Sequence, residues 1–131
     1  MKILKYSIGI FILVSLLIAC GSTSLKSKEK PVVIANDSLQ YEVIIIDIGF
    51  NSYLNSIAKP KGFHNQYYLE SRNKIYVNTW NYRARNPLLF DPNIYENTID
   101  YNATVNYGYD VNYKLFNYFE FAQRKYKMTL R

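Results

Sequence analysis

Two arginines, Arg72 and Arg83, have a spacing that could create a binding site. They are 11 residues apart, close to three helical turns, so both would point the same way from one helix. Both fall in an aromatic stripe that contains Tyr76 and Trp80. The functional interpretation is a pocket for an anion or a partner protein, lined by Arg72, Arg83 and Trp80.

A structural role for the two arginines is the alternative, and buried ion pairs are commonly structural. A charged group in an apolar stripe must be paired or hydrated. Each guanidinium would then stack on aromatic rings and pair with a carboxylate. The carboxylates considered for this pairing are Asp47, Glu42 and Asp100.

No catalytic constellation is recognisable around His64, the only histidine. A hydrolytic triad also needs a positioned nucleophile and an acid, and the chain has no G-x-S-x-G, H-E-x-x-H or phosphate-binding glycine run. Asp47 and Glu70 could be paired carboxylates for glycoside cleavage, but their spacing does not favour this over surface and capping roles. We therefore predict no catalytic residue, no metal site and no cofactor.

Exposed aromatic rings are a further candidate feature for binding. The segment YGYDVNYKLFNY, residues 107–118, interleaves aromatic and polar residues, and Tyr113 and Phe121 fall outside the apolar stripe of the helix predicted there. Such rings can stack on sugars or form a protein contact. Alternatively, they pack beneath the N-terminal tether or the 88–106 connection.

The single cysteine, Cys20, lies where an export signal would end. Lys2 and Lys5 precede an apolar core over residues 8–18, which is too short for a membrane span of about 20 residues. Leu17-Ile18-Ala19-Cys20 resembles the lipobox of bacterial lipoproteins. The resemblance implies diacylglycerol transfer to the Cys20 sulfur, whose thiolate is the nucleophile, and cleavage before Cys20. The alternative is a buried cysteine in an uncleaved helix.

Composition limits the mature chain to one domain without a disulfide framework. Cleavage before Cys20 leaves 112 residues, with 14 basic and 10 acidic side chains. This charge is mild and scattered, and an exported chain has little access to nucleic acid, so we expect no nucleic-acid partner. Lys26, Lys28 and Lys30 could lie against anionic lipid headgroups.

The strands are predicted from β-branched runs and alternation. We predict a signal peptide over residues 1–19, a lipid-anchored flexible tether over 20–40 and a small α+β domain over 41–131. The sequence YEVIIID, residues 41–47, predicts a strand covered on both faces. The apolar run after Pro31 is a candidate edge strand, and alternation predicts another strand near 95–101.

Three helices are predicted to pack on this sheet of two or three strands. The first covers residues 50–58 and ends at the Pro and Gly of residues 59–62. The second covers residues 65–86 and stops at Asn86-Pro87. The third is C-terminal, with Asp110 as its N-cap and Lys125 and Lys127 at its end.

Three stretches of the chain resemble a family of uncharacterised Bacteroidota lipoproteins with a domain of unknown function. They are YEVIIIDIGFNSYL, YYLESRNKIYVNTWNYRARNP and IDYNATVNYGYDVNYKLFNYFEFAQRKY. The resemblance implies an outer-membrane location and no known activity. Surface-exposed lipoproteins of this phylum tend to carry acidic residues after the lipidated cysteine. Residues 21–25 carry none, which favours the periplasmic leaflet.

The tripeptide Asp37-Ser38-Leu39 resembles the acceptor motif of the general O-glycosylation system of Bacteroidota, with Ser38 as the modified residue. It falls in the predicted tether, where a glycan is tolerated.

These features predict a non-enzymatic, lipid-anchored envelope protein. We expect it to dock onto another envelope component through an aromatic and basic surface. The first alternative is a glycan-binding module that uses exposed Tyr and Trp rings, and the second is a small hydrolase.

Overall fold

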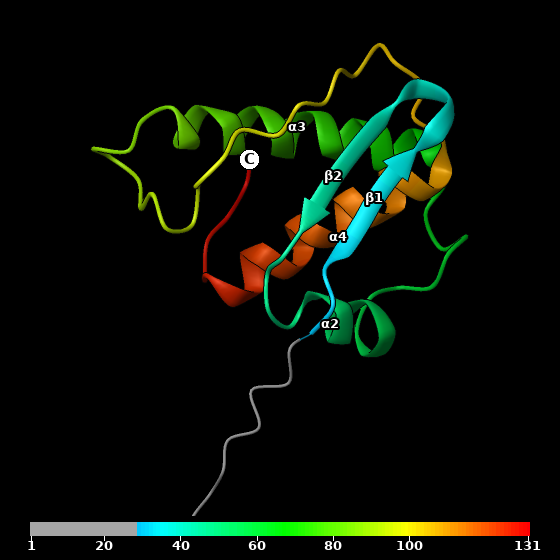
Figure 1. Cartoon of the computed structure of the whole chain (residues 1–131), viewed down its shortest axis with the longest axis horizontal. Coiled ribbons are helices and arrows are strands. Elements are labelled where there is room, and N and C mark those ends of the chain that lie inside the picture. Colours follow the sequence, from blue (N-terminus) through cyan, green and yellow to red (C-terminus); the bar gives the residue numbers. More distant parts are fainter. Residues whose placement is uncertain (1–28) are drawn as a thin grey trace, which may run out of the picture.

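The computed structural model describes residues 29–131, which form an α+β fold, as predicted. Two strands are followed by three helices (Figure 1). The elements in chain order are β1 (Val32–Asn36), the short 3-10 helix η1 (Asp37–Leu39), β2 (Tyr41–Ile45), α2 (Phe50–Ser56), α3 (Gln66–Ala84) and α4 (Tyr109–Lys125). The predicted signal peptide, Cys20 and the first part of the predicted tether lie outside the described residues.

The strands β1 and β2 form an antiparallel hairpin with one buried and one exposed face. The register runs from Val32 opposite Ile45 to Asn36 opposite Tyr41. Ile34 and Ile45 are buried against the helices, whereas Ile44 is 55% exposed and Ile46, just after β2, is 75% exposed. The prediction that this strand is covered on both faces is therefore wrong. In residues 29–131 the helices lie on only one side of the hairpin (Figure 1).

The folded part begins earlier than the predicted boundary at Tyr41. The candidate edge strand after Pro31 is confirmed as β1, which pairs with β2 along its whole length. Asn36, at the end of β1, donates a hydrogen bond from its side chain to the Tyr107 carbonyl oxygen at 2.9 Å. Residues 32–40 therefore belong to the domain.

Glu29 attaches the first described residues to the start of α2. Its carboxylate accepts hydrogen bonds from the backbone N–H of Gly49 and from both the backbone N–H (2.8 Å) and the hydroxyl (3.0 Å) of Ser52. The first N–H groups of a helix have no partner within the helix, and the helix dipole favours an anion there. Gly49, the N-cap residue, has no side chain to cap α2, so Glu29 caps it from a distance.

This contact makes Glu29 a pH-sensitive cap. Hydrogen bonds from the Gly49 and Ser52 backbones lower the pKa of Glu29 below its ordinary value of 4.5. Because the folded-state pKa is depressed, the contribution to stability is present at neutral pH and is lost as the pH falls through the folded-state pKa. We expect the Gly49 and Ser52 amide resonances to titrate together in ¹H–¹⁵N spectra with a midpoint below 4.5. Glu29→Gln should remove this titration, and a wild-type midpoint above 4.5 would contradict the contact.

Helix α4 is central, because it contacts β1, α2 and α3. Its residues Val111, Leu115, Phe119 and Ala122 are at most 2% exposed. The predicted N-cap is wrong: α4 begins after Gly108, whose φ of 81° a glycine adopts without strain. Asp110 lies in the first turn, where a carboxylate is still favoured by the dipole.

Residues 95–101 are not a strand, in contrast to the prediction. The backbone groups of Asn97 and Ile99 bond to side chains of α3 instead of to a neighbouring strand. The Asn81 side chain accepts from the Ile99 N–H at 2.7 Å and donates to the Ile99 carbonyl at 2.8 Å. Trp80 Nε1 donates to the Asn97 carbonyl at 2.9 Å. The Asn81 side chain thus makes the two hydrogen bonds with Ile99 that a neighbouring strand would otherwise make.

The C-terminal segment returns to α3 (Figure 1). Leu130 is fully buried, and the Thr79 hydroxyl donates to the Arg131 carbonyl at 2.6 Å. This end of the chain is therefore part of the packed domain.

Candidate functional site

A cleft of about 730 Å³ contains Arg72 and is bordered by α3, α4, the loop after α2 and the C-terminal segment. We call it the Arg72 cleft. Lys59, Arg72, Arg124 and Arg131 supply its cationic side chains, and Glu120 is the only acidic side chain that residues 29–131 contribute to its lining. An excess of cationic groups in a concave site attracts anions.

Arg72 is held by tyrosine and keeps unused donor capacity. Its Nη2 donates to the Tyr76 hydroxyl at 2.7 Å, which donates to Glu120 at 2.7 Å. The guanidinium lies over the Tyr76 ring at 4.7 Å, and the Tyr76 hydrogen bond raises the pKa of Arg72. Its Nε is buried without a hydrogen-bond partner in residues 29–131.

The structural interpretation of Arg72 is therefore only partly right. Ring stacking occurs, but none of the three predicted carboxylates bonds to Arg72. Glu120 interacts with it through Tyr76, and Asp47 pairs with Lys125 instead.

Aromatic rings form the wall of the cleft beside Arg72. The His64 ring stacks on Tyr68 at 4.3 Å and makes edge contacts with Phe63 and Phe116. Phe63 is 59% exposed and Tyr68 is 41% exposed, so part of this wall is accessible. The cleft thus combines cationic groups with exposed ring surface.

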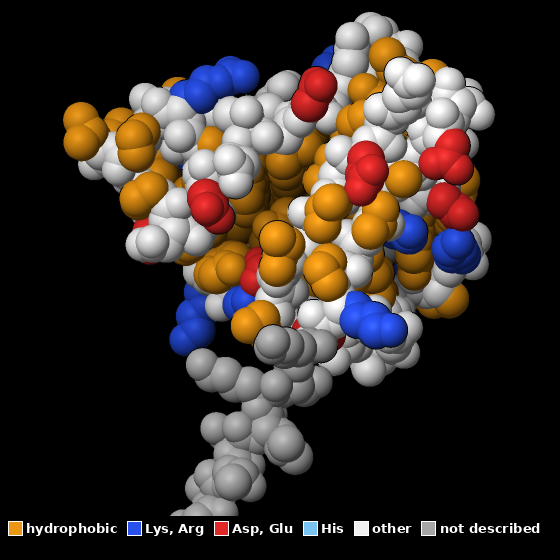
Figure 2. Space-filling model, viewed as in Figure 1, with side chains coloured by type: hydrophobic (Ala, Val, Ile, Leu, Met, Phe, Trp, Pro, Cys, Tyr) orange, Lys and Arg blue, Asp and Glu red, His pale blue; other side chains and the backbone are white. Residues whose placement is uncertain are grey.

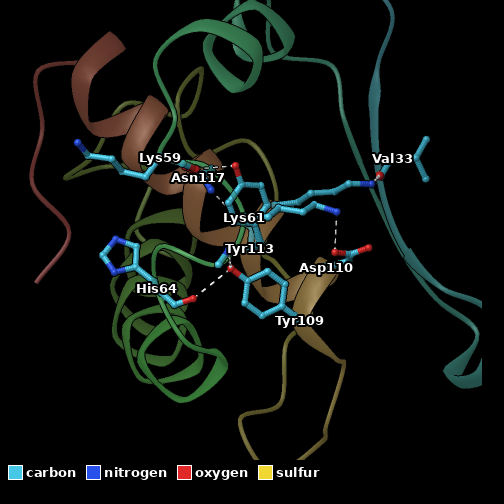
Figure 3. Close-up of polar contacts among 10 residues, drawn as sticks. Val33, Lys59, Lys61, His64, Tyr109, Asp110, Tyr113 and Asn117 are labelled. Carbon is cyan, nitrogen blue, oxygen red and sulfur yellow. Dashed lines mark hydrogen bonds and ion pairs between the residues drawn. The ribbon is translucent and has the colours of Figure 1, made fainter.

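Tyr113 does not present a free ring, because it helps to hold the loop that carries His64. Its hydroxyl donates to the Lys59 carbonyl at 2.7 Å (Figure 3). Tyr109 donates to the His64 carbonyl at 3.0 Å, and Lys61 pairs with Asp110 at 2.7 Å. Within residues 29–131, the Tyr113 hydroxyl therefore bonds to the 59–64 loop, and to neither the described part of the tether nor the 88–106 connection.

Arg83 does not share a site with Arg72. Their separation on α3 is roughly 16 Å along the helix axis. Arg83 donates to the Tyr95 hydroxyl and to the Thr129 carbonyl, both at 2.7 Å, and lies over the Phe90 and Tyr95 rings. It ties the C-terminal segment to α3, which is a structural role.

Trp80 is a core residue. It is 3% exposed and contacts Tyr95, Tyr118 and Phe119, so the expectation of an exposed tryptophan platform is wrong. Phe121 is also buried, at 7% exposed. Ser38 is exposed in η1.

Sequence reasoning missed the cleft residues contributed by α4. Glu120 and Arg124 are four residues apart, so they neighbour each other on one helix face, and that spacing was the available signal. Their meeting with Arg72 depends on how α3 packs against α4, which the spacing alone does not indicate.

In the described part of the chain, no three His, Cys, Asp or Glu side chains lie close enough together to hold a metal ion. No helix of residues 29–131 has the length and apolar character needed to cross a membrane.

Comparison with known protein families gives a match. A family model described as "Family of unknown function (DUF6146)" matches residues 7–131. No curated protein and no solved structure matches the chain.

Proposed function

The chain belongs to this family of unknown function, and from that premise we propose that it is a non-enzymatic, lipid-anchored envelope protein that docks onto another envelope component. The Arg72 cleft is the docking site, and it receives an anionic group of the partner beside an apolar or aromatic side chain. The anchor is the acylated Cys20, placed on the periplasmic side of the outer membrane of a Bacteroidota cell.

The observation that carries this proposal is the environment of Arg72. The guanidinium is held over one ring and uses one donor on Tyr76, in a cleft where, among residues 29–131, other cationic side chains outnumber the single acidic one. A guanidinium carries five N–H donors. Those of Arg72 that line the cleft can bind a carboxylate, phosphate or sulfate group.

The export signal and lipobox support the anchored location. A small domain close to a membrane, with a cleft but without a catalytic constellation, suits a binding role better than turnover.

The test first identifies the partner and then compares its binding to variants of Arg72 and Arg85. We expect cross-linking of the acylated protein in native membranes, followed by mass spectrometry, to capture one near-stoichiometric envelope protein. Arg72→Gln should weaken binding of that purified protein by about 10- to 100-fold, because a hydrogen bond to a charged group contributes about 1.5–3 kcal/mol. Titration calorimetry measures the change.

Arg85→Gln is the matched control, since Arg85 is exposed and lies outside the lining of the cleft. It should bind like the wild type. Equal binding by all three proteins, with Arg72→Gln normally folded, would contradict the docking site, and no enriched partner would contradict docking itself.

A glycan-binding role is the second candidate, because Phe63, Tyr67 and Tyr68 expose 59%, 79% and 41% of their surface. Rings of this kind can stack on sugars. Saturable binding on a glycan array that Tyr68→Ala abolishes would favour this candidate over a protein partner.

A further inference from the structure

A second groove follows the free edge of β2, separate from the Arg72 cleft. Its volume is about 550 Å³, and it lies between β2 and residues 93–100. Tyr118 and Tyr126, both half-buried, contribute aromatic lining, whereas Trp80 borders the groove but exposes only 3% of its surface. Figure 2 shows a hollow with hydrophobic side chains inside it and acidic side chains on both sides. We call it the β2 groove.

The backbone of β2 offers hydrogen-bonding groups to this groove. Lys114 donates to the Val33 carbonyl at 2.8 Å, so this carbonyl points away from β2. Val33 lies directly opposite Ile44. In an antiparallel pair, two opposed residues either exchange hydrogen bonds or both point their backbone groups outward. The N–H and C=O of Ile44 therefore point away from β1, and those of Glu42 do so by alternation.

No element of the described chain uses this edge. The sheet of residues 29–131 contains only β1 and β2. No backbone hydrogen bond in this region joins β2 to residues 93–100. In that segment, Asn97 and Ile99 bond to side chains of α3 instead. Unpaired edges are templates for an added strand.

The carboxylates that line the groove favour a basic strand at this edge. Glu42, Glu96 and Asp100 are exposed on the groove and make no ion pair within residues 29–131. Asp47, a fourth carboxylate there, pairs with Lys125. No lysine or arginine of the described residues lines the groove, so its potential is negative and attracts cations.

We propose that the β2 groove binds an extended, basic segment of a partner protein, which adds to β2 as a third strand. Its backbone pairs with Ile44 and Glu42, its apolar side chains contact the aromatic lining, and its lysines or arginines face the three free carboxylates. In strand addition, main-chain hydrogen bonds supply affinity and alternate side chains supply specificity.

A second copy of this chain fits the groove poorly. Pairing two β2 edges would bring Glu42 and its neighbouring carboxylates close to the same groups of the other copy, and like charges across paired strands are destabilising. The chain's own Lys26 and Lys28 are the other basic candidates, so the experiment separates them from a partner.

The probe is a synthetic hexapeptide of alternating lysine and valine, fluorescently labelled and titrated onto the acylated protein in neutral detergent. We expect saturable binding by fluorescence polarisation that weakens with added salt. A glutamate–valine peptide should bind at least tenfold more weakly. Two N-methylated versions, one at the lysines and one at the valines, test the pairing, since only one edge of the peptide meets β2. One version should lose at least tenfold in affinity, whereas unchanged binding by both would overturn strand addition.

Two proline variants locate the site on the protein. Proline is tolerated at an edge strand where the N–H faces outward. Ile44→Pro should remove binding, because it deletes an N–H that faces the groove. Ala35→Pro makes the same change on the opposite edge of the hairpin, since Ala35 is opposite Glu42, and should bind like the wild type. Equal loss in both folded variants would overturn the site.

Charge reversal provides a test if Ile44→Pro fails to fold. Glu96→Lys with Asp100→Lys should weaken binding at least tenfold, and Asp37→Lys, exposed outside the lining, should not. Unchanged binding by the double variant would overturn the proposal. If the peptide binds only after Lys26→Ser and Lys28→Ser, the segment of this chain that carries these lysines occupies the groove. That result would also overturn the proposal of a partner segment.

Discussion

Phe119→Ala is expected to lower the free energy of unfolding by about 3–5 kcal/mol. Phe119 is fully buried on α4. Its ring centroid lies 5.6 Å from that of Tyr76 and 5.9 Å from that of Trp80, both on α3. Truncation removes apolar contact and leaves a cavity between the two longest helices. Domains of this size have total stabilities of about 5–15 kcal/mol, so a large fraction of the stability would be lost.

Chemical denaturation followed by circular dichroism measures this loss. Phe63→Ala is the matched control, because Phe63 is 59% exposed, and substitutions at exposed sites usually change stability by about 0.5 kcal/mol or less. Similar losses of unfolding free energy in Phe119→Ala and Phe63→Ala would contradict the role of Phe119 in packing α4 against α3.

Asn112→Ala should also destabilise strongly, although a small polar side chain is lost. Asn73 and Asn112 are both fully buried. Asn73 donates to the Asn112 carbonyl (3.0 Å) and side-chain oxygen (3.1 Å), and the Tyr101 hydroxyl donates to the same side-chain oxygen at 2.8 Å. Burial raises the pKa of Tyr101 to about 12. Each group that loses its partner costs about 1–3 kcal/mol, so we expect a loss of about 3 kcal/mol.

A double-mutant cycle with Tyr101→Phe separates the network from a simple cavity. If the hydroxyl and the amide depend on each other, Asn112→Ala should cost less in the Tyr101→Phe background, with a coupling energy above about 0.5 kcal/mol. Strictly additive losses in urea denaturation would contradict the shared hydrogen bond.

The long helices and β2 could be predicted from local patterns. Apolar spacing indicates α3 and α4, and a β-branched run indicates β2. Asn73 could not be placed in this way, since the partner that accepts from its buried amide, Asn112, lies on another helix. The strand expected near 95–101 failed for a similar reason. Its alternation is real in part, as Tyr95 is 5% exposed, but the hydrogen bonds go to Asn81 and Trp80.

The candidate site was predictable only at Arg72. Helical spacing places Arg83 on the same side, but spacing cannot show that Tyr95 and the Thr129 carbonyl already use its donors. Trp80 was predicted on an aromatic face, but whether that face is covered depends on α4 and on residues 93–99. The β2 groove has no sequence signal, because the free edge exists only once residues 93–100 bond elsewhere.

The contact between Glu29 and the start of α2 has a mechanical consequence. A pull on the chain from its N-terminal side reaches Glu29 before it reaches β1. The carboxylate bonds to Gly49 and Ser52 must therefore break before the Val32–Ile45 pair, the first of the hairpin register, carries the load. Without this clamp, the force would peel β1 from β2 one residue pair at a time. Glu29 therefore protects the hairpin, and with it the free edge of β2, from tension applied on the N-terminal side of residue 29.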